Sequence, residues 1–355
     1  MNPAAFVEGV SDASPTPLTV DESTLVLGIE TSCDETAAAL VLGGHDVVSS
    51  VVSTQVDLHA DFGGVVPEIA SRAHLDVLNP VIARTIVEAG VDEERIDAVA
   101  CTVGPGLIGA LLVGVSAAKS LAMAWDVPFV GVNHMEAHLY AASLEDPTLE
   151  FPLLVMLVSG GHTMLVEMQG HGRYRLVGQT IDDAAGEAFD KVARFLDLGY
   201  PGGPAIDRAA LDGDPEAIRF PRAIMDDGYD FSFSGLKTAV VNYVRKHPDV
   251  SSDDVAASFQ AAVVDVLVTK ARRAAVEVGA TGIVLGGGVA ANSLLREQVL
   301  DACEAEGIQG FLPSREMCTD NAAMIAAAGW HRLRSDGPTP LDAGAVPNLR
   351  LTFID

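Results

Sequence analysis

Two histidines four residues apart are the residues whose spacing most clearly suits chemistry in this sequence. His134 and His138 lie within segment 133–138, which reads Asn-His-Met-Glu-Ala-His. On a helix, side chains four residues apart leave the same face one turn apart, and two imidazoles so placed can bind one divalent metal ion. The alternative is a helix that carries two unconnected histidines, and spacing by itself leaves both interpretations open.

Glu136, between the two histidines, decides what such a metal site could do. Zinc proteases carry the signature His-Glu-x-x-His, in which the Glu directly after the first His acts as general base on the metal-bound water. Glu136 comes one position later, and at about 100° per residue it points about 200° away from both histidines. We therefore predict a metal site without a protease base.

Two histidines do not complete a metal site, and Asp320 is our candidate for the third ligand. Thr319 and Asp320 precede a segment that we expect to be helical through Gly329, with these two residues as its cap. An aspartate that only caps a helix needs no metal, and spacing does not show that Asp320 approaches the histidines. Two nitrogens and one oxygen suit iron or zinc about equally well.

Two glycine-rich turns offer main-chain amides to an anion. Segment 159–161 (Ser-Gly-Gly) lies between two apolar runs, and segment 286–288 (Gly-Gly-Gly) precedes a helix that starts near Asn292. Backbone without side chains can approach a phosphate or a flat ring closely. Ordinary tight turns use the same residues, and neither segment has the spaced G-x-G-x-x-G pattern of a Rossmann dinucleotide site.

Acidic residues accompany these turns. Glu30, Asp34 and Glu35 lie in or beside the first polar turn, where they could hold a cation, orient a nucleophile or act as a base. A solvated turn is the alternative. Segment 182–191 carries several acids, with Asp190 on an expected helix, and acids in a first helical turn are favourable for the helix dipole without any function.

The elements that would position these residues form a weak internal repeat. An apolar run, a small polar turn and a second apolar run occur early in the chain and again in its middle. We interpret them as two hairpins that each open one half of the fold. Their strands are expected at 25–30 and 37–42, and at 153–158 and 164–168.

Strands that alternate with helices follow each hairpin and indicate an α/β fold. Ser251 or Ser252 would cap the longest helix, and Gly279 would end it. The other strands are expected at 96–103, 127–132 and 282–285, and the helices at 107–124, 251–277 and 291–306.

Composition limits the class of protein. The chain has 355 residues, which suggests about two domains, and 49% of them are hydrophobic, enough for a large core. We expect no membrane span and no secretory signal, because the first residues lack a basic start and an apolar middle. Four scattered cysteines predict no disulfide framework, so a reducing cytoplasm is the expected compartment.

The formal net charge of −27 restricts possible partners. Non-specific nucleic-acid binding depends on Lys and Arg that neutralise phosphates, so the chain as a whole would repel RNA. Binding to a nucleic acid would need a local basic patch, a metal, or a partner that supplies positive charge. The acidity is also compatible with a solubility or high-salt adaptation.

Eight motifs occur together in one order, and together they resemble the bacterial TsaD family, the tRNA N6-adenosine threonylcarbamoyltransferases. The resemblance runs from about Leu25 to the C-terminus, and the N-terminal tail and the acidity are the differences. The motifs are segments 28–36, 133–138, 158–163, 182–191, 201–204, 231–238, 286–292 and 318–321.

The resemblance implies the actin-like/Hsp70-like ATPase (ASKHA) fold, in which two similar α/β halves flank an active-site cleft. We accordingly expect a flexible tail at 1–24, a first half at 25–133, a second half at 134–324, and a C-terminal segment at 325–355 that packs back on the first half.

The resemblance also implies a reaction and its partners. The threonylcarbamoyl group of threonylcarbamoyl-AMP would be transferred to N6 of the adenosine 3′-adjacent to the anticodon, in tRNAs that read codons beginning with A. The proteins TsaB and TsaE would assist, and we expect them to help tRNA dock along a strip that includes Arg72 and Lys237.

The family's functional residues carry over onto matching positions. One divalent metal ion per subunit, with iron favoured and zinc possible, would be bound by His134, His138 and Asp320. Leu157, Val158, Ser159, Gly160 and Gly161 would line the phosphate and acyl part of the substrate, and Asp190, Gly203, Asp207 and Asn292 the nucleotide. Glu35, and with it Asp34, would lie at the reacting groups as catalytic residues.

Three other functions compete with the transferase. A metallopeptidase of the O-sialoglycoprotein endopeptidase type would need a base that Glu136 does not supply. A sugar kinase or chaperone-type ATPase of the same fold would explain the hairpins and glycine turns, but not the histidine pair. A non-catalytic nucleotide-binding scaffold is disfavoured by the intact Glu35 and by the complete set of proposed metal ligands.

Overall fold

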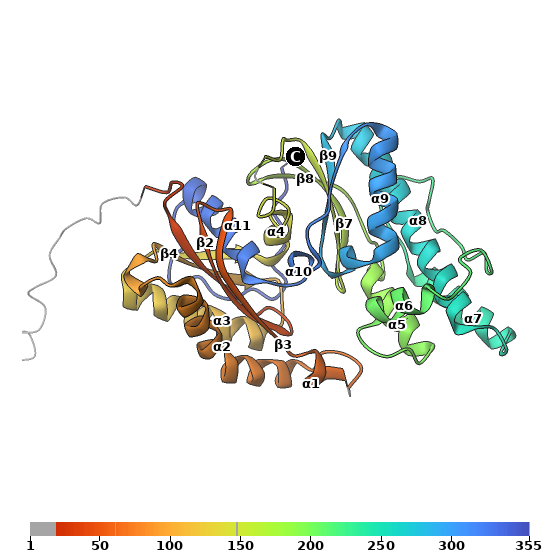
Figure 1. The fold of residues 1–355 in the computed structure, drawn as a ribbon, viewed down its shortest axis with the longest axis horizontal. Helices are drawn as coiled ribbons and strands as arrows, with labels where there is room; N and C mark the ends of the chain where they lie inside the picture. The colour runs from red at the N-terminus through yellow and green to blue at the C-terminus, as the bar shows by residue number, and fades with distance from the viewer. Residues whose placement is uncertain (1–18, 61, 147, 355) are drawn as a thin grey trace, which may run out of the picture.

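Two five-stranded sheets with flanking helices make up the described part of the chain, residues 19–60, 62–146 and 148–354, in a computed structural model. They lie on either side of the short helix α4 (Figure 1). The first sheet has the order β3-β2-β1-β4-β5 and the second β10-β9-β6-β7-β8.

The strands and helices have the following bounds. The first sheet contains β1 (Leu25–Glu30), β2 (Glu35–Leu42), β3 (Asp46–Thr54), β4 (Ala98–Gly104) and β5 (Phe129–Asn133). The second contains β6 (Leu153–Val158), β7 (Thr163–Gly170), β8 (Arg173–Gln179), β9 (Gly282–Gly286) and β10 (Gln309–Phe311). The helices are α1 (Val56–Ala60), α2 (Pro67–Ala89), α3 (Ile108–Trp125), α4 (His134–Leu139), α5 (Ala185–Phe195), α6 (Gly202–Ala210), α7 (Ser234–Lys246), α8 (Ser252–Val278), α9 (Ser293–Glu306), α10 (Arg315–Cys318) and α11 (Ala322–Asp336).

The predicted hairpin repeat is confirmed by the strand pairing. In the first sheet β1 pairs antiparallel with β2 and parallel with β4. In the second sheet β6 pairs antiparallel with β7 and parallel with β9. The outer strands continue the same pattern, so the two sheets share one topology.

Burial and capping explain why these segments form as they do. Every residue of β1 and β6 is buried, as expected for continuous apolar runs covered on both faces of a sheet. The side chain of Ser251 caps α8 by accepting a hydrogen bond from the main-chain N–H of Asp253. Gly279 ends α8 with a φ of 65°, which glycine adopts without steric cost, and both predictions for this helix are confirmed.

After the second sheet the chain returns to the first one. Helix α11 packs across β1, β2 and β4, and a Cβ atom at Gly28 would lie 2.2 Å from the carbonyl oxygen of Ala322. The helix runs past Gly329, where we expected it to end. A Cβ atom at Gly329 would lie 2.4 Å from that of Ala100, so this glycine permits close packing on β4 rather than termination.

The N-terminal residues divide into two parts. Residues 1–18 of the expected tail lie outside the described residues. Residues 21–24 form a turn against α11, where the Trp330 indole N–H donates a hydrogen bond to the Asp21 carbonyl oxygen at 3.2 Å and Thr24 is buried.

One helix within the described ranges, α3, is long and apolar enough to cross a membrane by length and composition alone, with a mean hydropathy of 1.6. Core helices satisfy the same criterion, and α3 packs against β4 and α2. Its apolar character is therefore weak evidence for a membrane.

Candidate active site

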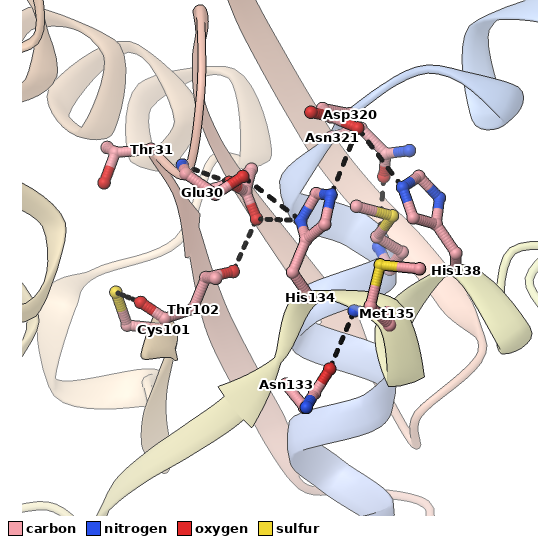
Figure 2. Close-up of polar contacts among 12 residues, drawn as sticks. Glu30, Thr31, Cys101, Thr102, Asn133, His134, Met135, His138, Asp320 and Asn321 are labelled. Carbon is pink, nitrogen blue, oxygen red and sulfur yellow. Dashed lines mark hydrogen bonds and ion pairs between the residues drawn. The ribbon is translucent and has the colours of Figure 1, made fainter. Parts of the chain in front are cut away.

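Helix α4 presents the two histidines, and its start is set by a side-chain cap. Asn133, the last residue of β5, accepts hydrogen bonds from the main-chain N–H groups of Met135 at 2.9 Å and Glu136 at 3.3 Å. The helix therefore begins at His134, and the rings of His134 and His138 lie on one face with their centroids 4.7 Å apart (Figure 2).

Asp320 faces both imidazoles. Its Oδ1 lies 3.5 Å from Nε2 of His134 and 3.2 Å from Nε2 of His138. Our expectation that residues 319–320 cap the last helix is wrong: Asn321 is the cap, accepting a hydrogen bond from the Met324 N–H at 3.0 Å. Because Asn321 caps the helix, the Asp320 carboxylate is available to the histidines.

These three side chains could hold one metal ion. Their donor atoms all lie within 4.8 Å of one another, and two imidazole nitrogens with a carboxylate oxygen suit a divalent transition metal. The chemistry of the donor set and its convergence both fit such an ion.

Glu30 holds His134 from behind. This fully buried carboxylate, at the end of β1, accepts hydrogen bonds from the Ser32 N–H and the Thr102 hydroxyl, both at 2.5 Å. Its Oε2 also lies 3.2 Å from Nδ1 of His134 (Figure 2). A carboxylate here keeps the proton on Nδ1, so Nε2 is the nitrogen that would give up its proton to bind a metal.

The histidines and carboxylates of this cluster each favour the charged form of the other. Although burial acts in the opposite direction, the carboxylates of Asp320 and Glu30 raise the pKa of His134 to about 9. Burial likewise opposes ionisation of Asp320, but the two histidines hold its pKa below the usual range. Nδ1 of the buried His138 has no hydrogen-bond partner among the described residues.

Two adjoining hollows open near the three candidate ligands, of which His134 and Asp320 line the first and none lines the second. One, of about 520 Å³, is lined by His134, Asp320 and segment 159–161. The other, of about 600 Å³, is lined by all four residues expected at the nucleotide, Asp190, Gly203, Asp207 and Asn292. Asp34, Glu35, Gly160 and Asp190 border both hollows.

Comparison with known proteins supplies the family. The model of the TsaD family, described as tRNA N6-adenosine threonylcarbamoyltransferase, matches residues 46–327. A protein of that name from Symbiobacterium thermophilum is 56% identical over 330 residues, which cover 92% of this chain and 97% of the relative. One from Anaeromyxobacter dehalogenans is 56% identical over 333 residues, covering 92% of this chain and 100% of the relative.

The chain belongs to the TsaD family. It is therefore a transferase, and the activity that its relatives' names give is threonylcarbamoyl transfer to tRNA.

Solved structures confirm the fold class. HypF from T. kodakarensis superimposes with a TM-score of 0.64 at 14% identity, covering 90% of this chain and 50% of HypF. Component A of (R)-2-hydroxyglutaryl-CoA dehydratase from Acidaminococcus fermentans gives a TM-score of 0.54 at 15% identity, covering 87% of this chain and 99% of that one. Both support the predicted two-lobed ASKHA architecture, and at this identity they bear on the fold alone.

The glycine turns of this TsaD chain have two different uses. Apart from its own residue and the two chain neighbours, no atom of the described residues lies within 4 Å of a Cβ built on Gly160 or Gly161, so this turn is open toward the first hollow. A Cβ on Gly287, which has a φ of 85°, would lie 2.6 Å from the Val158 carbonyl oxygen. Gly287 therefore lets the two turns approach each other.

Of the residues expected at the acyl part, Leu157 and Val158 are fully buried and line neither hollow. Their side chains pack in the hydrophobic cores beneath the turn, so only main-chain atoms of β6 could face a substrate.

The expected nucleotide residues are held by contacts with one another. The Asn292 amide donates to Asp207 Oδ1 at 3.1 Å and to Gln260 Oε1 at 2.7 Å. Asp190 Oδ1 accepts a hydrogen bond from the Gly202 N–H at 2.8 Å, which ties α6 to α5, and burial raises the pKa of Asp190. The pocket wall is thus organised by the fold itself.

Glu35 lies at the start of β2, where the Thr54 hydroxyl donates a hydrogen bond to it at 3.3 Å. Burial, with the nearby carboxylates of Asp320 and Asp34, raises the pKa of Glu35 to about 10. While Asp320 stays negatively charged, Glu35 is protonated at neutral pH and can donate a proton but not accept one.

Glu136 lies on the opposite face of α4, as the sequence predicts. It is 6% exposed, accepts a hydrogen bond from the Tyr174 hydroxyl at 3.1 Å, and pairs with Arg332 at 3.3 Å. It is not available as a base at the histidines, which removes the support for a metallopeptidase.

Sequence reasoning missed several residues of the cleft. Arg194 of α5 lines the first hollow and donates a hydrogen bond to the Gly63 carbonyl oxygen in the other half. Tyr200 borders both hollows, and Arg208 and Arg315 line the second. No spacing pattern marks these residues, although Arg194 and Tyr200 lie close to predicted motifs.

Proposed function

We propose that the chain transfers the threonylcarbamoyl group of threonylcarbamoyl-AMP to N6 of the adenosine 3′-adjacent to the anticodon, in tRNAs that read codons beginning with A. The observation that carries the proposal is the convergence of His134, His138 and Asp320 beside two hollows that share Asp34 and Glu35. A donor with an acyl end and a nucleotide end needs two adjoining compartments of this kind.

The reaction is an acyl transfer from a mixed anhydride. N6 forms a bond to the carbonyl carbon, the bond from that carbon to the phosphate oxygen breaks, N6 loses one proton, and AMP leaves. An exocyclic adenine amine is a weak nucleophile, so positioning and removal of the proton matter most. Glu35 and Asp34, at the junction of the hollows, are the candidate groups for handling that proton.

Two features would stabilise the charge that develops during transfer. Gly160 and Gly161 border the first hollow, where their main-chain amides could donate to a phosphate or carbonyl oxygen; the Ser159 N–H already donates to the His162 carbonyl oxygen at 2.8 Å. A divalent ion held by His134, His138 and Asp320, with iron favoured and zinc possible, would act as a Lewis acid toward the acyl donor.

Glu35 is the candidate general base, on a condition that its pKa imposes. Burial raises the pKa of Glu35 most, and the negative charges of Asp320 and Asp34 raise it further; neutralising Asp320 would lower this pKa, and Glu35 can act as a base only where its pKa is brought down in this way. If Glu35→Gln left both the rate and its pH profile unchanged, Glu35 would have no such role.

Partners would compensate for the acidity of the chain. We propose that TsaB and TsaE act with it in the cytoplasm and that tRNA docks only on the assembly. Lys237 pairs with Asp183 at 3.3 Å, so of the two cations in our expected strip, only Arg72 is an exposed side chain without an ion pair among the described residues. Equal tRNA affinity for the isolated chain and the assembly, at matched salt, would refute this.

One assay tests the reaction. The purified chain, TsaB, TsaE, threonylcarbamoyl-AMP and an unmodified tRNA transcript are combined, and digested nucleosides are analysed by mass spectrometry. We expect N6-threonylcarbamoyladenosine at the predicted position, loss of it with His134→Ala, and retention with the control His247→Ala, which changes an exposed histidine after α7. Full activity of a metal-free His134→Ala protein would refute the role of the ion, and absence of product with the native chain would refute the reaction.

A further inference from the structure

A third hollow lies behind α4, on the side away from the histidine pair. It has a volume of about 610 Å³ and is lined by Glu136 and Tyr140 of α4, by segment 171–174, by α11, and by segment 349–352 near the C-terminus. Neither His134 nor Asp320 borders it. We call it the rear cavity, and it is in the size range of small-molecule sites.

The C-terminal segment closes the rear cavity by spanning both halves. The Val346 N–H donates a hydrogen bond to the Val103 carbonyl oxygen in the first sheet, and the Ile354 N–H to that of Tyr174 in the second. Leu349 and Leu351, between these points, supply apolar surface to the wall.

Positive charge gathers in the rear cavity although the chain as a whole is strongly acidic. Arg173, Arg332 and Arg350 line it, against only two acids, Glu136 and Asp336. Arg332 forms ion pairs with both acids: its guanidinium lies 3.3 Å from the Glu136 carboxylate and 3.8 Å from the Asp336 carboxylate. Arg173 and Arg350 form no ion pair with any acid of the described residues, so two guanidinium groups remain for an anion.

Three aromatic side chains that stack on one another, Tyr140, His171 and His331, line the same cavity. His171 and His331 stack with centroids 3.7 Å apart and an interplanar angle of 16°, and Tyr140 stacks on His331 at 4.9 Å. Guanidinium groups match phosphate in a two-point geometry, and aromatic side chains pack against rings face-on or edge-on. The cavity is also too large for a phosphate ion alone.

We propose that the rear cavity binds a small phosphate-bearing molecule, with Arg173 and Arg350 on the phosphate and the histidine stack beside a flat ring. This site is separate from the hollows that would hold the acyl donor, and its occupancy does not depend on the proposed reaction.

The protein contains a reporter for this cavity. Trp125 and Trp330 are the two tryptophans in the chain. Trp330 contacts the cavity wall edge-on, 4.8 Å from the His331 ring. In a Trp125→Phe background, emission from Trp330 would report occupancy behind α4 and not at the front hollows. Trp330 itself lines a neighbouring hollow that shares His171 and His331 with the rear cavity, whereas Arg173 and Arg350 line the rear cavity alone of the two, so variants of these arginines assign the response.

The test titrates this protein at low salt with three probes: inorganic phosphate, uridine 5′-monophosphate and uridine. We expect saturable emission changes with both phosphate-bearing probes, tighter for the nucleotide, and none with uridine. Arg173→Gln/Arg350→Gln should weaken binding at least about tenfold, because two charge-assisted hydrogen-bonding groups are lost. The matched control Arg219→Gln/Arg245→Gln removes two exposed arginines outside the cavity and should bind like the parent.

Three results would overturn the proposal. These are no saturable response to either phosphate-bearing probe, equal affinity for uridine and its monophosphate, or equal affinity of the Arg173→Gln/Arg350→Gln variant and the parent. Circular dichroism of each variant verifies that a loss of binding is not a loss of fold.

Discussion

Glu30→Gln should weaken metal binding while leaving all three candidate ligands in place. Oε1 of Glu30 accepts from the Ser32 main-chain N–H, and Oε2 faces both the Thr102 hydroxyl and Nδ1 of His134. A glutamine must keep its oxygen on the Ser32 N–H, because the opposite orientation sets two donors against each other. Its NH₂ group then occupies the Oε2 position.

That NH₂ group would donate to Nδ1 of His134 and so favour the tautomer that carries its proton on Nε2, the atom that faces Asp320. A protonated Nε2 cannot bind a metal. The change also removes one buried charge-assisted hydrogen bond from the histidine, and losses of such supporting carboxylates typically cost about 10- to 100-fold in metal affinity. We expect a reduction of that size.

The assay is a competition titration of zinc or anaerobic ferrous iron against a chromogenic chelator, which requires no enzymatic activity. Glu167→Gln is the matched control, because Glu167 is also a buried carboxylate, but its hydrogen-bond partners are Gln169 and Arg175 of the second sheet. Its metal affinity should stay within about twofold of the native value. A folded Glu30→Gln protein with native metal affinity would refute the reasoning.

Three further predictions concern stability. Lys270→Met should lower the free energy of unfolding, measured in urea, by about 3 kcal/mol, because the buried ammonium donates to three carbonyl oxygens that would lose their partner. A decrease below about 0.5 kcal/mol would contradict this. Asn321→Ala should cost about 1 kcal/mol in the same measurement through loss of the α11 cap, whereas Thr319→Ala, which does not cap the helix, should cost less. Burial, with His171 and Arg334 nearby, lowers the pKa of His331 to about 3, so the unfolded chain binds a proton that the folded protein resists, and stability falls as pH drops from about 6.5 toward 3. His331→Phe should lose less stability than the native chain between pH 7 and pH 4, and equal losses would exclude His331 as a cause.

The strands and helices could be predicted from the sequence because apolar runs, helix caps and turn residues, which determine them, lie within each segment. The apolar runs of β1 and β6 are buried along their whole length, and the cap and stop of α8 are the residues expected. The matching turns after β1 and β6 predicted two similar halves, and the shared strand order confirms this.

Which of Asp320 and Asn321 caps α11 could not be predicted from the sequence. Both residue types are strong helix caps, and they are adjacent in sequence, so local preference does not distinguish them. The histidines of α4 distinguish them in the fold, because they attract the charged side chain and leave the amide to the helix. Only the tertiary contact separates the metal-ligand candidate from the cap.

The contact between Glu30 and His134 could not be predicted from the sequence either, because it is also a tertiary contact. The two residues are 104 positions apart, and they meet because β4 pairs in parallel with both β1 and β5, which brings the ends of β1 and β5 to one edge of the sheet. Spacing along the chain identifies ligands that share a helix, but the residue that orients a ligand comes from another strand.

The contacts of helix α4 explain the position of Glu136, two residues after His134 instead of one as in the zinc-protease signature. Six residues are too few to hold a helix in place by their own hydrogen bonds, so α4 must be fixed from outside. Glu30 and Asp320 contact its front face, and Tyr174 and Arg332 bind Glu136 at its back. The sequence signature of zinc proteases needs a glutamate directly after the first histidine; at position 136 the glutamate instead contacts Tyr174 and Arg332 and helps to hold the helix in place.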